Sequence, residues 1–443
     1  MSPDREVEQN RFAVCRLAKF GICRFTMERV MNNPRPKVRI ENLVKIYGEN
    51  PQHALKLFRE GGNRDEILSA TGNVLGVADV SMTINEGELF VIMGLSGSGK
   101  STLVRCINRL IPPTSGHIYI DDEDIVNVSK ERLREIRRTK ISMVFQRFGL
   151  FPHKSVLDNV QYGLEVRGID LEERRQKALD TLEVVGLRQW ADYLPSSLSG
   201  GMQQRVGLAR ALATDAPILL MDEAFGALDP LIRRGMQEEL IRLQRDLQKT
   251  IIFISHDIQE SLKIGDRVAI MKDGYMVQVG TPEEIVTNPV NDYIRDFTLD
   301  VNRAQVLTTG SIMKESRRFQ LGQGTAQLAL EEMQDLHRNH MFVVDNDKPV
   351  GLLVLDELEA AVGRGVQDVH QVMVKDFHQV SGDMNLEEVF QMAQSGIPLA
   401  VVDQQGHFKG MIEPTDILAG ISGGLNHGSS QQTVAEFQPE LVS

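Results

Sequence analysis

The stretch from Gly94 to Thr102, Gly-Leu-Ser-Gly-Ser-Gly-Lys-Ser-Thr, constrains this chain more than any other feature. It fits the pattern G-x-x-x-x-G-K-[ST]. The apolar run from Glu88 to Met93 predicts a buried strand before it, and Ser101 to Leu110 predicts a helix after it. Glycines let successive backbone N–H groups face one anion, and the N-terminus of the helix favours the same anion. The stretch therefore predicts the phosphate-binding loop of a nucleoside triphosphatase.

Every residue of this loop is a predicted nucleotide ligand, and the set is Gly94, Leu95, Ser96, Gly97, Ser98, Gly99, Lys100, Ser101 and Thr102. We expect Lys100 to reach the β- and γ-phosphates and to take part in catalysis, and the Ser101 hydroxyl to ligate Mg²⁺. The competing interpretation is a glycine-rich turn that binds nothing. The lysine and serine, placed between a predicted strand and a predicted helix, argue against it.

Two further apolar runs end in residues suited to hydrolysis. Ile218 to Met221 leads into Asp222 and Glu223, and Thr250 to Ile254 leads into Ser-His-Asp. We expect Asp222 to hold Mg²⁺ through water and Glu223 to polarise the attacking water. Strands that alternate with helices in this way predict a mostly parallel sheet covered by helices.

Bulk properties exclude several classes of protein. A length of 443 residues predicts two or three domains. No run of about 18 apolar residues predicts a membrane span. The three cysteines (Cys15, Cys23 and Cys106) form no disulfide framework, which suits a reducing cytosol. The net charge of −12 argues against general nucleic-acid binding. Residues 305–443 hold 8 Lys/Arg against 19 Asp/Glu, so the excess acid predicts a separate C-terminal module.

The motif set resembles the nucleotide-binding domain of ABC transporters. Besides the phosphate loop and Asp222-Glu223, the chain has Gln146 after an apolar run, Leu198-Ser199-Gly200-Gly201, Ala227-Leu228-Asp229 and His256, in that order. The resemblance implies catalytic roles for Glu223, His256, Gln146 and Lys100. It also implies nucleotide contacts for Tyr47, Ser199, Gly200, Gly201 and Asp229, and Mg²⁺ ligation by Ser101, Gln146 and Asp222. ATP and Mg²⁺ are the implied cofactors.

The two glycines of Leu198-Ser199-Gly200-Gly201 open a predicted helix and form a second anion site with bare N–H groups. One chain does not need two phosphate sites for one nucleotide. In the family, this signature of one copy closes on the γ-phosphate held by another. The resemblance therefore implies a homodimer with ATP between the two copies, driven open by hydrolysis.

More specific sequence features narrow the resemblance to the ATP-binding subunits of glycine betaine and proline betaine importers, a quaternary amine uptake family. These features include an insert between Tyr47 and Gly76, for which the sequence predicts two helices, at Gln52 to Glu60 and at Asp65 to Ala70. They also include Met221-Asp222-Glu223-Ala224-Phe225 and Gly280-Thr281-Pro282-Glu283-Glu284-Ile285. The resemblance implies an ATPase on the cytoplasmic face of the membrane that drives uptake of a quaternary amine osmoprotectant. The implied solute is glycine betaine or proline betaine, with proline or choline as alternatives. The implied partners are transmembrane permease subunits, which dock near Phe151-Pro152-His153, and an extracytoplasmic substrate-binding protein, with no nucleic acid. The solute contacts lie outside this chain.

An internal repeat supports that resemblance. Met341-Phe342-Val343-Val344-Asp345 recurs as Leu399-Ala400-Val401-Val402-Asp403, and Gly351 to Leu358 recurs as Gly410 to Ile417. Each copy predicts helix, strand, turn, strand, helix, and the pair resembles tandem CBS domains. The resemblance implies an adenylate-type ligand with Asp416 on its ribose, or a purely structural dimerisation role. The hypothesis that this module gates transport in response to ionic conditions rests on the same resemblance.

The predicted fold is an α/β phosphate-loop ATPase with antiparallel β and helical subdomains, followed by the CBS pair. We expect a basic, disordered leader at 1–36, with a lipid-contacting segment or a misplaced start as alternatives. The ATPase spans 37–304, with an insert at 49–76 and a helical subdomain at about 150–213. The CBS pair spans 305–425, as about 305–365 and 366–425, and 426–443 is a tail.

Three other functions compete with this interpretation. An importer ATPase for amino acids or methionine shares the ATP-hydrolysing motifs, but the insert and the repeat argue against it. An ABC protein of DNA repair or translation would carry two cassettes or a long coiled coil. A regulatory nucleotide-binding module would not need the intact Glu223 and His256.

Overall fold

The computed structural model describes residues 35–145, 149–226 and 228–423. Most of the predicted leader, the predicted tail, Ala227 and the predicted Mg²⁺ ligand Gln146 therefore lie outside the described residues.

A six-stranded sheet with the order β10-β9-β3-β8-β7-β6 carries the nucleotide-binding part. Neighbouring strands are parallel except β9 and β10, which form an antiparallel pair. Every residue of β3, β7 and β8 is buried. The parallel pairing therefore brings the carboxyl ends of β3, β8 and β7 side by side. The strands are β3 (Leu89–Met93), β6 (Ile141–Val144), β7 (Ile218–Asp222), β8 (Thr250–Ser255), β9 (Arg267–Lys272) and β10 (Tyr275–Gly280).

A second, antiparallel sheet with the order β2-β1-β4-β5 packs on one face of the first. Phe90 and Ile92 of β3 share a core with this sheet, whereas Val91 and Met93 face the opposite core. Successive strand residues point to opposite faces, so β3 needs apolar residues at every position. The strands are β1 (Pro36–Tyr47), β2 (Val74–Asn85), β4 (Ser115–Ile120) and β5 (Glu123–Asp124).

The insert between β1 and β2 forms the two helices that the sequence predicts, α2 (Pro51–Arg59) and α3 (Arg64–Thr71). Asn63 begins α3 with a capping box, because its side chain accepts the backbone N–H of Glu66 while Glu66 accepts the backbone N–H of Asn63. Ala54, Leu55 and Ile67 join a small core with the end of β1. The insert therefore folds as a packed helical unit on the end of β1.

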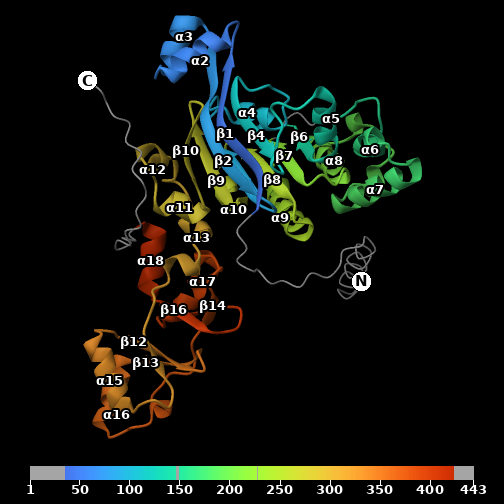
Figure 1. The fold of residues 1–443 in the computed structure, drawn as a ribbon. Coiled ribbons are helices and arrows are strands. Elements are labelled where there is room, and N and C mark those ends of the chain that lie inside the picture. Colours follow the sequence, from blue (N-terminus) through green and yellow to red (C-terminus); the bar gives the residue numbers. More distant parts are fainter. Residues whose placement is uncertain (1–34, 146–148, 227, 424–443) are drawn as a thin grey trace. The chain divides into compact units, whose positions relative to one another are not determined.

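Helices cover the parallel sheet and extend to one side of it (Figure 1). The lateral group of α6, α7 and α8 has its own core, which includes Val160, Leu182 and Val206. The helices are α4 (Lys100–Ile107), α5 (Lys130–Thr139), α6 (Val156–Val166), α7 (Leu171–Val184), α8 (Gly200–Ala213), α9 (Pro230–Leu247) and α10 (Ile258–Ile264), with short 3₁₀ turns at Arg188–Trp190 and Pro195–Ser197.

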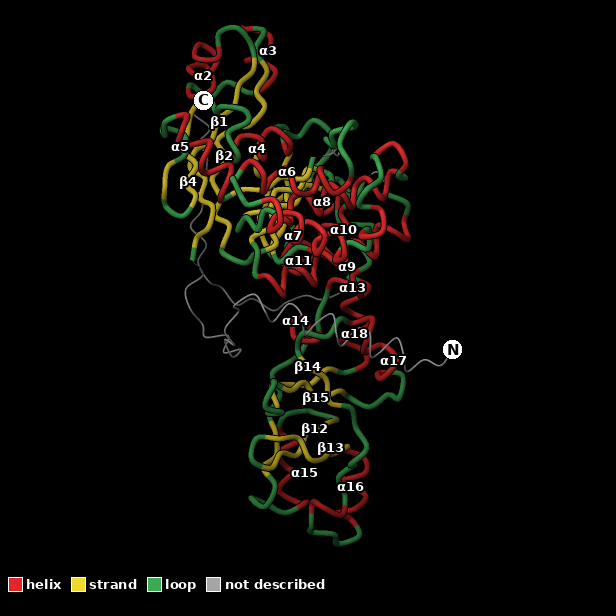
Figure 2. The backbone as a smooth tube through the Cα atoms, turned by 90° about the vertical axis from the view of Figure 1, so that its right-hand side faces the viewer, coloured by secondary structure: helices red, strands yellow, loops and turns green. Residues whose placement is uncertain are grey.

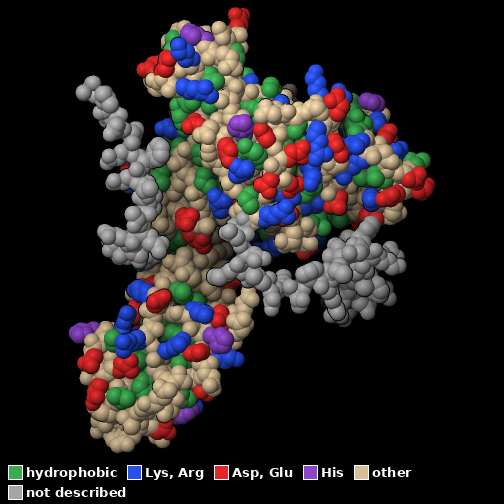
Figure 3. Space-filling model, viewed as in Figure 1, with side chains coloured by type: hydrophobic (Ala, Val, Ile, Leu, Met, Phe, Trp, Pro, Cys, Tyr) green, Lys and Arg blue, Asp and Glu red, His purple; other side chains and the backbone are tan. Residues whose placement is uncertain are grey.

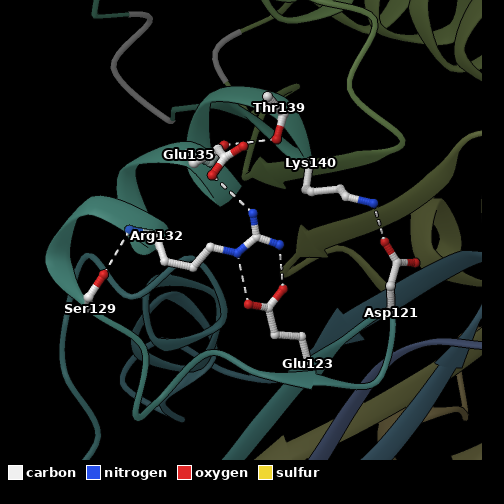
Figure 4. Close-up of polar contacts among 7 residues, drawn as sticks. All are labelled: Asp121, Glu123, Ser129, Arg132, Glu135, Thr139 and Lys140. Atoms are coloured by element: carbon white, nitrogen blue, oxygen red, sulfur yellow. Dashed lines mark hydrogen bonds and ion pairs between the residues drawn. The ribbon is translucent and has the colours of Figure 1, made fainter.

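Ion pairs attach α5 to the antiparallel sheet (Figure 4). The Arg132 guanidinium donates two 2.8 Å hydrogen bonds to the Glu123 carboxylate of β5. Lys140, the residue before β6, pairs with Asp121 at 2.6 Å. These half-exposed pairs add little stability individually, but the bidentate geometry of Arg132 fixes the direction of α5. The pair between Lys140 and Asp121 likewise fixes the start of β6.

The C-terminal part consists of two repeats with the same order of elements. The first holds β11 (Arg318–Gln320), α15 (Ala326–Asp335), β12 (His340–Asp345), β13 (Lys348–Val354) and α16 (Leu355–Gly363). The second holds β14 (Gln379–Ser381), α17 (Leu386–Ala393), β15 (Leu399–Val402), β16 (Phe408–Ile412) and α18 (Pro414–Ser422). The short strands β11 and β14, each parallel to its neighbour, complete the two three-stranded sheets. β12 and β13 of the first repeat and β14 and β15 of the second are labelled in Figure 2.

Each repeat has its own core, and a third core joins them. Phe342, Val344 and Leu352 of the first repeat pack against Phe408 and Met411 of the second. The segment before the first repeat contributes to the core of the second, through two short helices that lead into it, α13 (Arg303–Val306) and α14 (Thr309–Ile312). Two more helices stand between β10 and α13 in the chain, α11 (Pro282–Thr287) and α12 (Asp292–Phe297). A 3₁₀ turn at Val369–Gln371 packs on the first repeat.

Acidic and basic side chains are interspersed on the visible face of the molecule (Figure 3). Both signs of charge also appear on the C-terminal module in this view, although its sequence is strongly acidic. The visible face therefore offers no single-sign field of the kind that attracts a polyanion.

Candidate active site

The phosphate loop connects β3 to α4, and two of its glycines are required by the surrounding backbone. Gly94 has φ 145° and Gly99 has φ 100°. A Cβ atom at Gly94 would lie 2.2 Å from the Met271 carbonyl oxygen, and one at Gly99 would lie 2.3 Å from the Gly76 carbonyl oxygen. Neighbouring strands β9 and β2 therefore press on the loop from outside. This close packing holds the backbone N–H groups of the loop in one curved arrangement.

Lys100 lies in the first turn of α4 and is only 4% exposed. Its ammonium group donates to the carbonyl oxygens of Gly94 at 2.8 Å and Leu95 at 2.9 Å. Burial lowers the pKa of Lys100, and the nearby carboxylates of Glu223 and Asp222 oppose that shift. It also donates to the Ser98 hydroxyl at 3.5 Å. A buried ammonium bonded only to neutral oxygens of its own loop fits a site for phosphate oxygens, which would satisfy its charge more fully.

Ser101 and Asp222 meet at the end of β7. The Ser101 hydroxyl donates to Asp222 Oδ1 at 2.9 Å, although the two residues are 121 positions apart. Asp222 is 1% exposed, and its other oxygen lies 3.4 Å from the guanidinium of Arg105. A hydroxyl and a carboxylate in contact beside a phosphate loop are the oxygen donors that Mg²⁺ prefers.

Arg105 was missed by the motif analysis. It lies four residues after Ser101 on α4, so both side chains share one face of the helix. That spacing is the signal from which the contact with Asp222 could have been found.

Tyr47 lies at the end of β1, where its hydroxyl group is 3.2 Å from the Thr102 hydroxyl of α4. Its ring is partly exposed, and the ring edge lies 2.9 Å from the position of a Cβ atom at Gly76. Only glycine at position 76 leaves room for the ring. The structure thus places the hydroxyl of Tyr47 beside the start of α4 and a ring edge against Gly76, while the Lys45 ammonium lies 4.9 Å from the ring centroid. The role of Tyr47 as an adenine platform stays a prediction.

Glu223 and His256 follow neighbouring strands. Glu223 directly follows β7 and His256 directly follows β8, and Glu223 Oε2 lies 3.8 Å from His256 Nδ1. Glu223 has φ 49°, in the left-handed region that is unfavourable for a residue with a side chain. A hydrogen bond from the Gly226 N–H to the Glu223 carbonyl oxygen closes this turn at 3.2 Å. A carboxylate held by such a turn beside a histidine at the strand ends can orient water and accept its proton.

The signature residues lie at the start of α8. Ser199 caps the helix by accepting the Met202 N–H, and Ser199 and Gly200 are exposed. A Cβ atom at Gly201 would lie 3.1 Å from the Leu228 side chain. Asp229 caps α9 by accepting the N–H groups of Leu231 and Ile232, each at 3.1 Å. Within the described ranges, no hydrogen bond or ion pair joins the signature to the phosphate loop of the same chain.

Comparison with known proteins shows which family this chain belongs to. The sequence pattern of the family described as ABC transporter matches residues 77–226, and that of the CBS domain matches residues 366–423. The glycine betaine transport ATP-binding protein OpuAA of Bacillus subtilis is 46% identical over 90% of this chain and 96% of its own length. The chain belongs to the glycine betaine transport family of ABC ATP-binding proteins.

Other relatives extend the comparison. The glycine betaine/proline betaine transport system ATP-binding protein ProV of Escherichia coli is 48% identical over 88% of this chain and 99% of its own. The trimethylamine N-oxide transport system ATP-binding protein TmoW of Ruegeria pomeroyi is 47% identical over 72% of this chain and 94% of its own. This ABC ATPase thus has the predicted fold class, an ATP-binding cassette followed by a CBS module. Its enzymatic activity is ATP hydrolysis coupled to transport. None of the helices in the described ranges combines the length and apolarity needed to cross a membrane.

Proposed function

We propose that this ABC ATPase powers the uptake of a quaternary ammonium osmoprotectant, with glycine betaine and proline betaine as the first candidates. Support comes from relatives whose names specify these solutes and whose similarity extends over 88–90% of this chain, beyond the cassette into the repeats. A relative whose name specifies choline is 34% identical over 77% of the chain, which makes choline a weaker candidate. The relatives described above are named for betaines, choline or trimethylamine N-oxide, and none of them for amino acids or methionine.

ATP and Mg²⁺ are the proposed cofactors of the site. The loop N–H groups and Lys100 hold the phosphates, Tyr47 stacks on the base, and Ser101 and Asp222 supply Mg²⁺ ligands, with Gln146 as a further ligand. The bound ion draws charge from the phosphate oxygens. Glu223 accepts a proton from the attacking water at its carboxylate, and His256 donates a hydrogen bond toward the terminal phosphate.

Two copies of the chain form the working unit. The observation that supports this is the exposed signature: Ser199 and Gly200 present helix N-terminal N–H groups that are joined to no phosphate loop of their own chain. In a head-to-tail pair, these groups and Asp229 contact the nucleotide held by the partner subunit. Each ATP is then bound between two chains, and hydrolysis removes the charge that holds them together.

Permease subunits and an extracytoplasmic substrate-binding protein complete the proposed transporter, and the ATPase lies on the cytoplasmic face of the membrane. A group of rings before and within α6 is the proposed permease contact. Phe151 packs edge-on against Tyr162 at 4.7 Å between ring centroids, and the Lys154 ammonium lies 4.9 Å from the Tyr162 centroid. Aromatic rings such as Phe151 and Tyr162 are enriched at protein interfaces.

The C-terminal module is proposed to regulate the transporter in response to ionic conditions. Asp416, the predicted ribose ligand, pairs with Lys314 at 2.5 Å and accepts the Glu413 N–H at 3.0 Å. A ribose would have to replace Lys314, so the alternative structural role of this aspartate stays open. Deletion of residues 305–443 tests the regulatory proposal: uptake should become independent of internal salt, and an unchanged salt response would refute it.

The Glu223→Gln variant tests the ATPase proposal. Glutamine keeps the shape of the side chain but cannot accept the proton of water, so the variant should bind ATP, stop hydrolysing it and accumulate as a dimer. Light scattering with and without ATP measures the dimer. A variant that stays monomeric with ATP would refute the two-chain site. Uptake of labelled betaines, choline and amino acids by the reconstituted transporter separates the candidate solutes.

A further inference from the structure

Helix α9 is connected to the residues on both sides of His256, to Asp257 directly and to Ser255 through Glu260, and these connections lie outside the motifs described above. α9 begins at Pro230 with Asp229 as its N-cap, and Arg233 and Gln237 lie about one turn apart on the same face of it. Both side chains point to the segment that follows β8, in which His256 stands between Ser255 and Asp257. The small cavity at this point is lined by residues that include Arg233, Glu223 and His256.

The first contact is a buried chain of hydrogen bonds. The Gln237 amide donates to Glu260 Oε1 at 2.9 Å, and the Ser255 hydroxyl donates to Glu260 Oε2. Ser255 also accepts the backbone N–H of Asp257 at 3.0 Å. Gln237, Glu260 and Ser255 are all at least 91% buried. Buried polar groups that satisfy one another in this way resist displacement, because a broken bond leaves an unpaired group away from water.

The second contact is an ionic one, and it includes the segment before α9. One nitrogen of the Arg233 guanidinium lies 3.8 Å from the Asp257 carboxylate, and another donates to the Leu228 carbonyl oxygen at 3.1 Å. Asp257 itself caps α10 by accepting the Glu260 N–H at 3.1 Å. Arg233 therefore connects the residue before Asp229 with the residue after His256.

This connection continues to the signature. Leu228 lies against Gly201, where an added Cβ atom would be only 3.1 Å from its side chain. A shift of Gly201 therefore has a path of contacts through Leu228 and Arg233 to Asp257. Packed residues with few voids transmit such shifts and do not absorb them.

Glu223 and His256 lie close enough that a small movement along this connection would bring their side chains into contact. The 3.8 Å between Glu223 Oε2 and His256 Nδ1 exceeds the range of a catalytic hydrogen bond, about 2.6–3.2 Å. A movement of less than about 1 Å by the His256 segment would bring the two groups into contact, and displacements of that size can change rates about 100-fold.

We propose that Arg233 is a positioning residue for hydrolysis, which places His256 against Glu223 in response to the position of the signature and Asp229. The inference rests on the proposed roles of Glu223 and His256. In the two-chain unit the signature and Asp229 contact the partner's nucleotide, so Arg233 links the ATP bound at one site to the hydrolysis chemistry at the other. Gln237 and Glu260 keep the His256 segment rigid enough to follow α9.

The test compares Arg233→Ala with Arg234→Ala in the full-length chain. Arg234 is the matched control, because it is the adjacent arginine of α9, is mostly exposed, and pairs with Glu238 of its own helix. Arg233→Ala should lower kcat for ATP about tenfold, and reduce the Hill coefficient for ATP toward one, with KM changed less than about twofold. Arg234→Ala should leave all three unchanged. Arg233→Lys, which keeps the charge, should restore part of the loss.

A cycle with His256→Ala separates positioning from general destabilisation. If Arg233 acts through His256, Arg233→Ala should cause no further loss of kcat in the His256→Ala background. Losses that multiply would overturn the proposal, as would equal activity of the Arg233→Ala and Arg234→Ala variants. A fall in the melting temperature of Arg233→Ala below that of Arg234→Ala, with kcat restored on cooling, would also overturn it. Unchanged hydrolysis by His256→Ala would instead refute the proposed role of the histidine itself.

Discussion

Alanine in place of Gly97 or of Gly99 should have clearly different effects, although both glycines belong to the phosphate loop. Both have positive φ, 80° for Gly97 and 100° for Gly99. A Cβ atom at Gly97 would meet no heavy atom within 4 Å, whereas one at Gly99 would lie 2.3 Å from the Gly76 carbonyl oxygen. The pair therefore separates the cost of backbone conformation from the cost of a steric clash.

The expected magnitudes follow from these two terms. Gly97→Ala carries only the left-handed backbone cost, about 1–2 kcal/mol. Gly99→Ala carries the same cost plus a clash with the backbone of β2, which cannot rotate away as a side chain can. Ordinary contact begins at 3.4 Å, so β2 and α4 must separate by about 1 Å. Overpacking of this kind adds about 1–3 kcal/mol, which should lower the melting temperature by roughly 2–12 °C relative to Gly97→Ala.

Thermal unfolding of both variants without nucleotide, followed by ATP titration, measures these effects. The separation of β2 from α4 also reaches Tyr47, which packs on Gly76 and contacts Thr102, so Gly99→Ala should lose more ATP affinity as well. If Gly99→Ala melts at or above the temperature of Gly97→Ala, then β2 does not confine the loop and the steric argument fails.

Three other predictions concern charged or buried groups. Burial lowers the pKa of Lys100 below 10.5, so between that lowered pKa and 10.5 the nucleotide-free chain should gain stability as pH rises. Over the same range the affinity for ATP should fall, because the ammonium charge is lost. Urea midpoints measure the stability, and ATP titrations measure the affinity. Burial raises the pKa of Cys106 to about 12, so alkylation at neutral pH should be slow in the folded chain and fast after unfolding, in a variant with the other two cysteines changed to serine. Lys314→Met should destabilise the C-terminal module by about 1–3 kcal/mol, because the 7%-exposed Asp416 carboxylate loses its cation, and adding Asp416→Asn should recover part of the loss in thermal melts.

Local sequence patterns predicted most elements of this protein, because the patterns are strong. The insert helices form within one or two residues of their predicted positions, since Asn50 and Asn63 cap them and glycines end them. The alternation of buried strands and helices around the phosphate loop predicted the parallel sheet. The short strands β11 and β14 were missed, because three residues carry too little periodicity to be distinguished from loop.

By itself the sequence predicted which residues contact ATP, and it determined where each of them stands relative to its own strand or helix. Glycine spacing, strand ends and capping residues are local properties, and they located Lys100, Ser101, Asp222, Glu223 and His256. Only the tertiary structure decided which of these meet. The order β3-β8-β7 places Ser101 against Asp222 and leaves 3.8 Å between Glu223 and His256. Strand order and helix packing depend on contacts between distant segments, and no local pattern encodes those contacts.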